Sequence, residues 1–524
     1  MSGFRASIIT DPLRLAFVGA AITPVLPDPA CTAQARTPNA ASPLPRNDGL
    51  VPLAMLQDAL GYGAMSFVLD TASSSVAISG TPRLTDGNSD RALHGDIARA
   101  NSGMQGTGVT IGILSDSFNL LGGAAADVAA GNLPGNIRIL QEGSGGHDEG
   151  RAMADLIHKT APGAAIMFHT ATSGEANFAQ GIVALQQAGC QIIIDDVSYL
   201  DEPFFQEGNI VQQAVQQVID AGANYFTSAS NEGQNFLQAN LTVIRTAIPG
   251  LPLLWNVENF GSTAQPAAST SLTVPVNGAC SIDLQWDQPF AGIGGSAGST
   301  SSLAMALYST AGKLVAVAGG LALHKNPEQL LRFTNTTSGT GFRLVLFSNH
   351  AALSPSQFKF IVYGNATVND TRAGQGSGTV TGHELVAGAN TVGAEAWSST
   401  PAFGGNGQVE GFSSVGSGQL LFDAAGHRLA QPVDTGKVSF VAPDGSMTSV
   451  FAPFYGTSAA APNAAAVAAL VLQADPLLTP AQVTAILKQS AVPAYSAFGG
   501  GAVGTGLIQA DRAVSLALAM PHHA

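Results

Sequence analysis

The feature that most restricts the fold is a regular alternation of short apolar segments with helical patterns. The apolar segments are fully apolar rather than alternating, which is typical of strands buried on both faces. Helices between such strands indicate a parallel sheet covered on both sides. We therefore predict an α/β fold with a parallel sheet sandwiched by helices. The apolar segments lie at 109–114, 165–168, 191–197 and 223–228, and the helical patterns at about 149–160, 175–188 and 209–221.

A different pattern occupies residues 237–372. Segments of alternating polarity, such as 271–276 and 358–363, are separated by Gly, Asn, Ser and Thr, and clear helical patterns are absent. Alternation of this kind favours strands with one buried face, so we expect an inserted all-β, sandwich-like domain. The α/β pattern surrounds it, which predicts a first part of the main domain over 84–236 and a second over 373–520.

The N-terminus resembles a secretion signal. Two arginines precede an apolar run at 15–26, and Ala33-Gln34-Ala35 follows as an A-x-A cleavage pattern. We predict a signal peptide over 1–35, a pro-region over the Pro-, Ser- and Thr-rich residues 36–83, and a secreted or periplasmic protein. The apolar run is too short to span a bilayer and no other segment reaches 18 apolar residues, so no membrane span is expected.

The charge of the chain argues against one class of partner. It has 35 Asp and Glu against 21 Lys and Arg, a net charge of −14, and no cluster of basic residues. Nucleic acid is therefore not an expected partner. The three cysteines suggest no disulfide framework, and no Cys or His spacing is typical of a metal site. The oligomeric state stays open.

Two segments carry residues suited to acyl transfer. Asp116 follows the apolar segment 109–114, at the edge where α/β sheets place ligands. Ser458 follows Gly456 and Thr457, before an alanine-rich helical pattern expected over 462–473. A serine at a helix N-terminus meets partial positive charge, which suits a nucleophile and an oxyanion donor. Taken alone, each residue has another interpretation: Asp116 as an ordinary loop acid and Ser458 as a helix-capping serine.

The segment from Gly456 to Pro462 resembles the nucleophile motif of the subtilases, the subtilisin and sedolisin clan of serine peptidases. The resemblance covers about 84–236 and 376–515, and its landmarks occur in the clan's order. It implies a subtilisin-like fold and a serine endopeptidase that acts on protein or peptide substrates. The other landmarks are Asp116-Ser117, Ser228–Gly233, Asn390–Ala394, Phe412–Gly416, Val441–Gly445 and Gly504–Ala510.

The resemblance also implies roles for single residues. Ser458 would be the nucleophile and Asn231 the side-chain oxyanion donor. Ser198 and Tyr199 would belong to the edge strand that pairs with the substrate backbone. Asp116 would be the catalytic aspartate. Calcium occurs in this clan, but no Asp-rich loop here is persuasive, so no cofactor is expected.

The sequence departs from subtilisins at the general base. Subtilisins carry His-Gly-Thr where this chain has Glu149-Gly150-Arg151, and His147 lies two residues earlier in a glycine-rich loop. Sedolisins use a Ser-Glu-Asp triad, so the chain resembles a subtilisin-like frame with a sedolisin-like base. It lacks two sedolisin acids, because Met153 and Asn231 occupy their positions.

The acids near this base set the expected pH range. Asp116 is expected to share a proton with Glu149, because two close carboxyl groups do not easily both ionise. Asp196 ends an apolar strand and shares a strand face with Ser198, so it is a candidate auxiliary acid. A glutamate base with an ordinary pKa of about 4.3 favours activity in acid.

Three functions remain open from the sequence. The first is an acid-active serine endopeptidase with an Asp116, Glu149 and Ser458 triad. The second is a pseudoprotease that lost its base and serves as a binding module. The third is an adhesin or carbohydrate binder whose inserted domain presents Trp255, Trp286 and Tyr308, unless these aromatic residues pack in the core.

Overall fold

The computed structural model describes most of the chain beyond residue 82. The expected signal peptide lies outside the described residues, as does the expected pro-region apart from one short strand and Arg83. The side chains of that strand are not described. The described ranges are 67–69, 83–251, 254–320, 322–348, 355–370, 372–497 and 503–520.

A seven-stranded sheet forms the centre of the first lobe. Its order is β22-β19-β7-β5-β2-β4-β3 and every pairing is parallel. The central strands β5 and β7 are buried along their whole length, as their apolar sequences predicted. The strands are β2 (Thr110–Ser115), β3 (Arg138–Gln141), β4 (Ala165–Thr170), β5 (Ile192–Asp195), β7 (Asn224–Ser228), β19 (Asn390–Ala396) and β22 (Phe440–Asp444).

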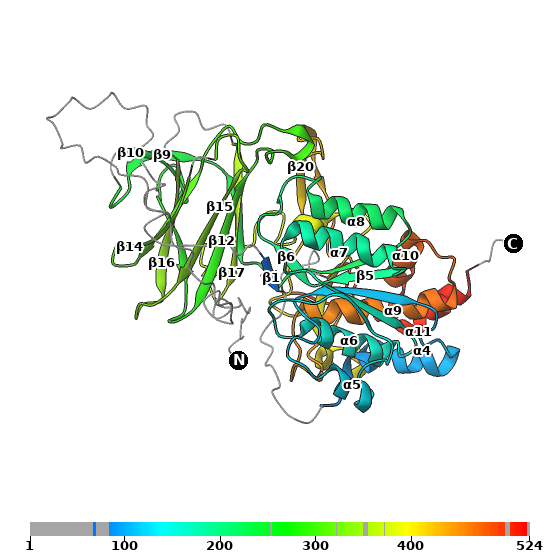
Figure 1. Ribbon diagram of the computed structural model, residues 1–524. Coiled ribbons are helices and arrows are strands. Elements are labelled where there is room, and N and C mark those ends of the chain that lie inside the picture. Colours follow the sequence, from blue (N-terminus) through cyan, green and yellow to red (C-terminus); the bar gives the residue numbers. More distant parts are fainter. Residues whose placement is uncertain are drawn as a thin grey trace, which may run out of the picture.

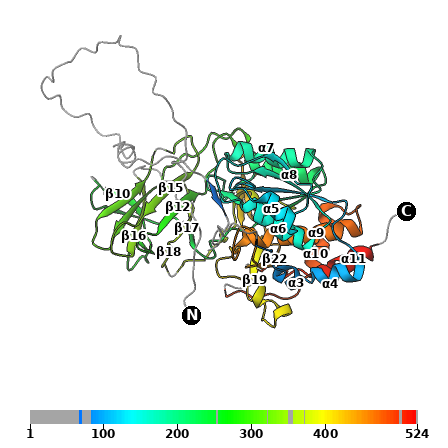
Figure 2. The same cartoon turned by 60° about the horizontal axis from the view of Figure 1, so that its bottom comes forward.

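Helices cover both faces of this sheet. Figure 1 shows α7 (Glu175–Gln187) and α8 (Ile210–Asp220) above the sheet, with α6 (Glu149–Thr160) and α9 (Thr457–Ala474) below it. Figure 2 shows the same layers from another side. The predicted α/β fold is therefore confirmed. The remaining helices are α3 (Asn88–Ala92), α4 (Gly95–Ser102), α5 (Ala124–Ala130), α10 (Pro480–Ser490) and α11 (Ala510–Leu518), and the 3₁₀ turns are η1 (Ile293–Gly295), η2 (Gly382–Leu385), η3 (Trp397–Ser399) and η4 (Pro401–Phe403).

Helix α9 runs through the core of the first lobe. It contacts five strands of the sheet, and its alanines let the helix approach them closely. It begins at Thr457, so the expected start at Pro462 is wrong and the proline lies inside the helix. Within the described ranges α9 alone is long and apolar enough to cross a membrane, and 89% of it is buried.

Two antiparallel sheets form the second lobe beside the first (Figure 1). One has the order β15-β12-β17-β8, and the other β14-β13-β16-β10-β9, with β11 beside β16 and β18 beside β11. Apolar side chains fill the space between them, so the expected β-sandwich is confirmed. The strands are β8 (Phe236–Asn240), β9 (Val243–Ala247), β10 (Leu254–Glu258), β11 (Thr270–Thr273), β12 (Ala279–Trp286), β13 (Ala304–Ser309), β14 (Leu314–Ala318), β15 (Glu328–Thr334), β16 (Gly341–Ser348), β17 (Gln357–Gly364) and β18 (Thr367–Val368).

The aromatic residues of the sandwich are packed in cores. Trp286 lies in the apolar cluster between the sheets. Trp255 packs edge-on against Phe347 with ring centroids 5.2 Å apart, and Tyr308 belongs to the same cluster. All three aromatics are buried, so they do not form the exposed platform that a carbohydrate binder needs.

Hydrogen bonds fix the junction between the lobes. Gln285 of β12 accepts from the backbone of Phe204 at 2.8 Å and donates to the Glu202 carbonyl at 2.9 Å. Gln206 accepts from the backbone of Phe290 at 2.8 Å. The short strands β1 (Phe67–Leu69) and β6 (Val197–Tyr199) lie at this junction, whereas β20 (Gln419–Phe422) and β21 (Arg428–Asp434) form a separate hairpin.

Candidate active site

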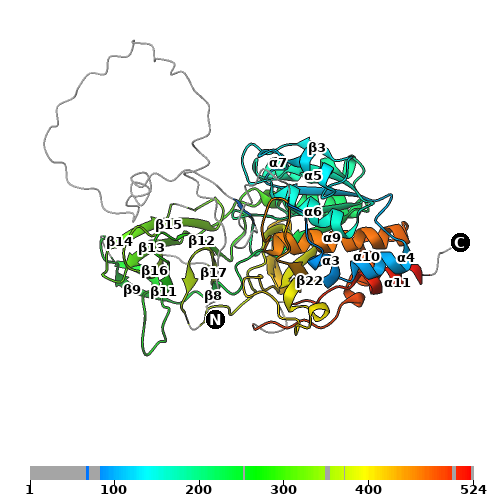
Figure 3. The ribbon, with the colours of Figure 1, turned by 90° about the horizontal axis from the view of Figure 1, so that it is seen from below.

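Parallel strands bring the expected site residues to one edge of the sheet. Asp116, Asp196 and Asn231 follow β2, β5 and β7, which are neighbours in the sheet. Glu149 is the first residue of α6, and Ser458 is the second residue of α9. These two helices pack against each other, and Figure 3 shows them side by side. All five residues therefore lie toward the edge where α/β sheets bind ligands.

Asp116 is held by backbone donors. Its carboxylate accepts from the N–H groups of His147 at 2.6 Å and Glu149 at 2.9 Å, and from the N–H of Ser117. Burial raises the pKa of Asp116 to about 6, although these hydrogen bonds favour the charged form. The aspartate is therefore bound at the start of α6 through the backbone.

The glycine-rich loop before α6 wraps this aspartate. A Cβ atom at Gly146 would collide with the Asp116 carboxylate, and one at Gly143 would collide with the Asp116 carbonyl oxygen. Gly146 also has a φ of +131°, which other residues rarely adopt. Glycine at these two positions lets the loop reach the carboxylate closely.

Glu149 and Asp196 form a buried pair of acids. Both are fully or almost fully buried, at 1% and 0% exposure. Burial raises the pKa of Asp196 well above its usual range, and the charges of Glu149 and Asp116 and a hydrogen bond with Glu149 raise it further. The Asp196 carboxyl group also accepts a hydrogen bond from Ser115 Oγ at 3.1 Å. Burial and mutual repulsion therefore disfavour the simultaneous ionisation of these three carboxyls.

The nucleophile candidate sits at a fixed helix start. Ser458 is completely buried, and its Oγ makes no hydrogen bond within the described part of the chain. Asp444 accepts from the Gly456 N–H at 2.9 Å. Asn463 donates to the Pro443 carbonyl at 3.0 Å, which ties the second turn to β22. These contacts hold the backbone around the serine while its hydroxyl remains available.

The amide of Asn231 has a defined orientation. Its Oδ1 accepts from both the backbone N–H and the hydroxyl of Thr457, each at 3.1 Å. Both partners lie at the start of α9, so the carbonyl end of the amide faces the helix and the NH₂ end faces the other way. An oxyanion donor needs this arrangement, because the NH₂ group must point at the substrate.

Glu384, in η2, was not predicted from the sequence. Its Oε1 accepts from Ser198 Oγ at 2.8 Å and from Ser230 Oγ at 2.7 Å. It thereby connects β6 to the residue before Asn231, where φ is +67°. Burial raises the pKa of Glu384 to about 7. The Thr381-x-x-Glu384 capping box was the only signal in the sequence.

His383 has a structural environment, which the sequence left undecided. Its Nδ1 lies 2.8 Å from Glu202, and its Nε2 lies 3.2 Å from Asp195. The two carboxylates raise its pKa well above the usual range despite burial. A histidine held between two acids is a buried cation and not a free base.

The expected substrate strand pairs with an extended segment. Ser198 and Tyr199 lie in β6, which pairs antiparallel with β1 in the register Phe67 to Tyr199 and Val68 to Ser198. The Tyr199 hydroxyl donates to the Ala171 carbonyl at 2.7 Å. The edge of β6 therefore accepts an added antiparallel strand, which is the pairing that β-augmentation by a peptide uses.

Comparison with known proteins decides the family. The family described as "Subtilase family" matches residues 128–506, which include Glu149, Asn231 and Ser458. The chain belongs to the subtilase family. Subtilases are serine-type peptidases, so this chain is a hydrolase with protein or peptide substrates. No curated protein matches the sequence.

Solved structures give the fold of this subtilase independent support. The CspB protease of Clostridium perfringens is 13% identical with a TM-score of 0.53, and the match covers 83% of this chain and 100% of that one. Fervidolysin from Fervidobacterium pennivorans is 13% identical with a TM-score of 0.39, covering 86% and 51%. MycP1 from Mycobacterium smegmatis is 14% identical with a TM-score of 0.36, covering 86% and 90%. The similarity to CspB supports a shared subtilisin-like fold.

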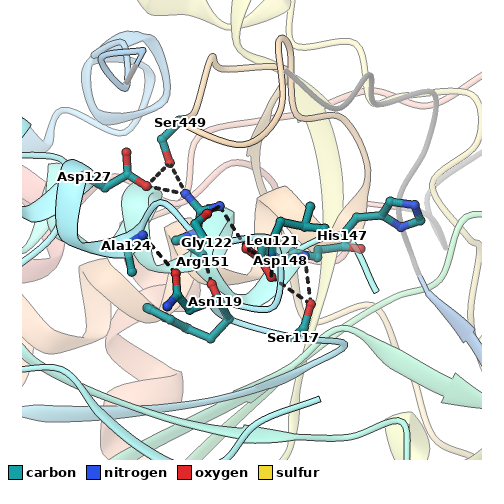
Figure 4. Close-up of polar contacts among 12 residues, drawn as sticks. Ser117, Asn119, Leu121, Gly122, Ala124, Asp127, His147, Asp148, Arg151 and Ser449 are labelled. Atoms are coloured by element: carbon teal, nitrogen blue, oxygen red, sulfur yellow. Dashed lines mark hydrogen bonds and ion pairs between the residues drawn. The ribbon is translucent and has the colours of Figure 1, made fainter. Parts of the chain in front are cut away.

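A buried arginine of the subtilase anchors the start of α6 (Figure 4). Arg151 binds Asp127 and Asp148, the latter at 2.9 Å, and donates to the Phe118 carbonyl at 3.1 Å. Asp148 in turn accepts from Ser117 Oγ at 3.1 Å. The network thus connects Ser117, which follows Asp116, to Asp148, which precedes Glu149.

His147 does not lie in the position of a base for this network. Its backbone N–H binds Asp116, and Figure 4 shows its ring pointing away from Ser117 and Asp148. The ring is half-buried and belongs to the loop, not to α6. Glu149, in contrast, is the first residue of α6 and is buried. Among the described residues of the subtilase, no group of three or more His, Cys, Asp or Glu side chains is suited to hold a metal.

Proposed function

We propose that this subtilase is an endopeptidase that uses a Ser458, Glu149 and Asp116 triad. The observation that carries the proposal is the group of three buried carboxyls, Asp116, Glu149 and Asp196, at the sheet edge toward which Ser458 and Asn231 also lie. A peptidase without a histidine base needs a carboxylate that accepts a proton and a second acid that shares it.

The reaction would follow the acyl-enzyme route. Ser458 Oγ attacks the scissile carbonyl carbon while Glu149 takes the hydroxyl proton. The Asn231 NH₂ and the Ser458 N–H stabilise the negative oxygen. Glu149 then gives its proton to the leaving amine as the C–N bond breaks, and a water molecule, activated by the same carboxylate, hydrolyses the ester.

We assign different roles to the two acids beside Glu149. Asp116 accepts three backbone N–H groups, which favour its ionised form and fix its direction. Asp196 has no backbone donor among the hydrogen bonds described, and charged neighbours disfavour its ionisation. Asp196 therefore holds the shared proton and donates to Glu149, and Asp116 positions the start of the base helix. This arrangement makes the subtilase sedolisin-like at its base.

The proposal includes activity in acid and a location outside the cytosol. A carboxylate base is ionised at a lower pH than a histidine base, and burial raises the pKa of the neighbouring Asp116 to about 6. The signal-like residues 1–35 support secretion or a periplasmic location. The pairing of β1 with β6 supports a pro-region over 36–83 that occupies the substrate edge.

The test is a pH–rate profile on a denatured protein substrate. We compare wild type with Glu149→Gln, His147→Ala and Ser458→Ala. The proposal expects activity that is highest in acid, is abolished by Glu149→Gln and Ser458→Ala, and survives His147→Ala. Loss of activity in His147→Ala, with a rate that rises through about pH 6–7, would assign the base to the histidine instead.

The absence of a histidine at the start of α6 favours one alternative, a pseudoprotease that binds peptides without cleaving them. Against it, the orientation of Asn231 and the fixed start of α9 are those of an intact oxyanion site. No hydrolysis by the wild type at any pH, together with peptide binding, would select this alternative.

A further inference from the structure

A cavity of about 300 Å³ lies where the two lobes meet. The first lobe contributes the start of α7, the loop after β6 and the start of α8. The second lobe contributes the loop after β12 and the loop before β15. The cavity therefore exists only because the β-sandwich is inserted beside the sheet. Its lining includes Glu175, Asp201, Asn209, Phe290, Ile293 and Asn326.

The cavity is acidic, and the basic groups that act on its acids, His383 and Arg332, do not belong to its described lining. Glu175 and Asp201 are its only charged lining residues, and no Lys, Arg or His lines it. Glu175 Oε1 and Asp201 Oδ1 are buried and have no hydrogen-bond partner within the described residues. Burial, followed by the charges of Glu202 and Asp201, raises the pKa of Glu175 to about 8. Buried acceptors without donors cost free energy, and a bound cation would remove that cost.

A second unpaired group lines the same cavity. Asn209 is only 7% exposed, and its Oδ1 caps α8 by accepting from the Gln212 N–H at 2.7 Å. Its Nδ2 has no hydrogen-bond partner in the described part of the chain. The wall thus combines carboxyl oxygens, which accept hydrogen bonds, with an amide donor, as the binding of a cationic residue together with its peptide carbonyl requires.

The cavity lies on the path of a chain paired with β6. Asp201 follows Tyr199 by two residues, and the Tyr199 hydroxyl accepts from the Gly174 N–H at 3.1 Å, next to Glu175. A peptide bound to β6 in the same antiparallel direction as β1 would extend toward Asp201 at its N-terminal end. Ser198, at the other end, is 2.8 Å from Ser230, which precedes Asn231. The cavity is therefore on the N-terminal side of the scissile bond.

We propose that this cavity is a substrate subsite for a cationic side chain, lysine or arginine, located N-terminal to the scissile bond. Glu175 and Asp201 bind the cation, the Asn209 NH₂ group donates a hydrogen bond to a peptide carbonyl, and the loop at 290–294 forms the opposite wall of the site. The inserted lobe would thus contribute to substrate selection. The inference rests on the proposed endopeptidase function.

The kinetic test uses two sets of fluorogenic peptides that are identical except for one residue. Lysine or norleucine is placed in turn at each of the six positions before the cleaved bond, and kcat/KM is measured at a pH where wild type is active. We expect a lysine preference of about tenfold at one position, because hydrogen bonds to charged groups contribute about 1.5–3 kcal/mol. The preference should fall toward one in Glu175→Gln and Asp201→Asn, and persist in the control Asp220→Asn, an exposed acid at the far end of α8.

A binding test separates this inference from the proposed function. The same labelled peptides are titrated against the Ser458→Ala protein, and anisotropy gives the dissociation constants without hydrolysis. Tighter binding of the lysine peptide, lost in Ser458→Ala/Glu175→Gln, supports the subsite even if wild type proves inactive. Equal binding of lysine and norleucine peptides, or no binding of either, overturns the subsite. Cleavage without any lysine preference also overturns it but leaves the endopeptidase proposal standing.

Discussion

The backbone N–H of Glu149 donates a 2.9 Å hydrogen bond to Oδ1 of Asp116. The first residue of the base helix thus orients the neighbouring aspartate through its backbone, which leaves the glutamate side chain for other contacts. Asp196 is linked to that side chain by a hydrogen bond and by charge. The sequence predicted that Asp116 shares a proton with Glu149, whereas the function proposed above gives that role to Asp196.

Asp196 gives the first prediction. Asp196→Asn keeps a hydrogen-bond donor toward Glu149 but has no proton to lose, so we expect an active enzyme whose rate no longer falls on the alkaline side. Asp196→Ala removes the donor and should lower kcat/KM by about 10²-fold or more. Both are measured as pH–rate profiles, with thermal unfolding to check the fold. An asparagine variant that folds and is as inactive as the alanine variant would contradict the role assigned to Asp196.

Asn231 gives the second prediction. Asn231→Ala removes one oxyanion donor, and we expect kcat to fall about 10²–10³-fold with little change in KM. Asn231→Asp should retain more activity than the alanine variant in acid, because a protonated carboxyl can donate, and should lose this advantage as pH rises. Steady-state kinetics at pH 4 and pH 7 give both ratios. A fall in KM alone, or equal losses in the two variants at pH 4, would show that the side chain is not the donor.

Local sequence patterns predicted most of the peptidase lobe, because strand and helix signals there are short-range. The edge strand β3 was missed, since its residues are half-exposed and lack an apolar run. The expected strand at 271–276 ends at Thr273, because Pro275 cannot donate to a sheet ladder. The expected strand at 191–197 divides into β5 and β6, with Asp196 between them.

Candidate residues could be named from the sequence where they lie in recognisable segments, as Asp116, Glu149 and Ser458 do, and their catalytic roles stay predictions. Glu384 was not, since it lies 186 residues from Ser198 and meets it only after folding. The acidic cavity was not predictable either, because it depends on how the inserted lobe rests on the first lobe. Tertiary placement of polar residues is the information that local patterns lack.

The third prediction concerns stability and pH. Burial raises the pKa of Asp116 to about 6, of Asp155 and Glu384 to about 7, and of Glu232 to about 8. Between the unfolded values near 4 and these values the folded state binds more protons, so stability falls as pH rises. A shift of one pKa unit equals about 1.4 kcal/mol. In a large domain, a change of about 1 kcal/mol moves Tm by about 2–4 °C. We therefore expect Tm to drop by at least about 4 °C between pH 4.5 and pH 7.

Calorimetry over that interval provides the measurement for the third prediction. Below pH 7 the buried amines Lys359 and Lys437 do not oppose the trend, because their pKa values are lowered by burial to about 7 and both states stay largely protonated. The raised pKa of His383 acts in the same direction as the acids, since its stabilising effect is lost as pH rises. A Tm that increases from pH 4.5 to pH 7 would show that the buried acids ionise freely.

The fourth prediction concerns the anchor of α6. Arg151 is nearly buried with Asp127 and Asp148, so Arg151→Met leaves two acids without their partner and should cost about 3–5 kcal/mol of unfolding free energy. The matched control is Arg372→Met, because Arg372 likewise makes two hydrogen bonds to carboxylate oxygens, both of Asp370, but its side chain is 29% exposed. That variant should lose about 1 kcal/mol or less. Urea unfolding of both variants measures the two losses of unfolding free energy. Equal losses would mean that the Arg151 network does not hold the start of α6.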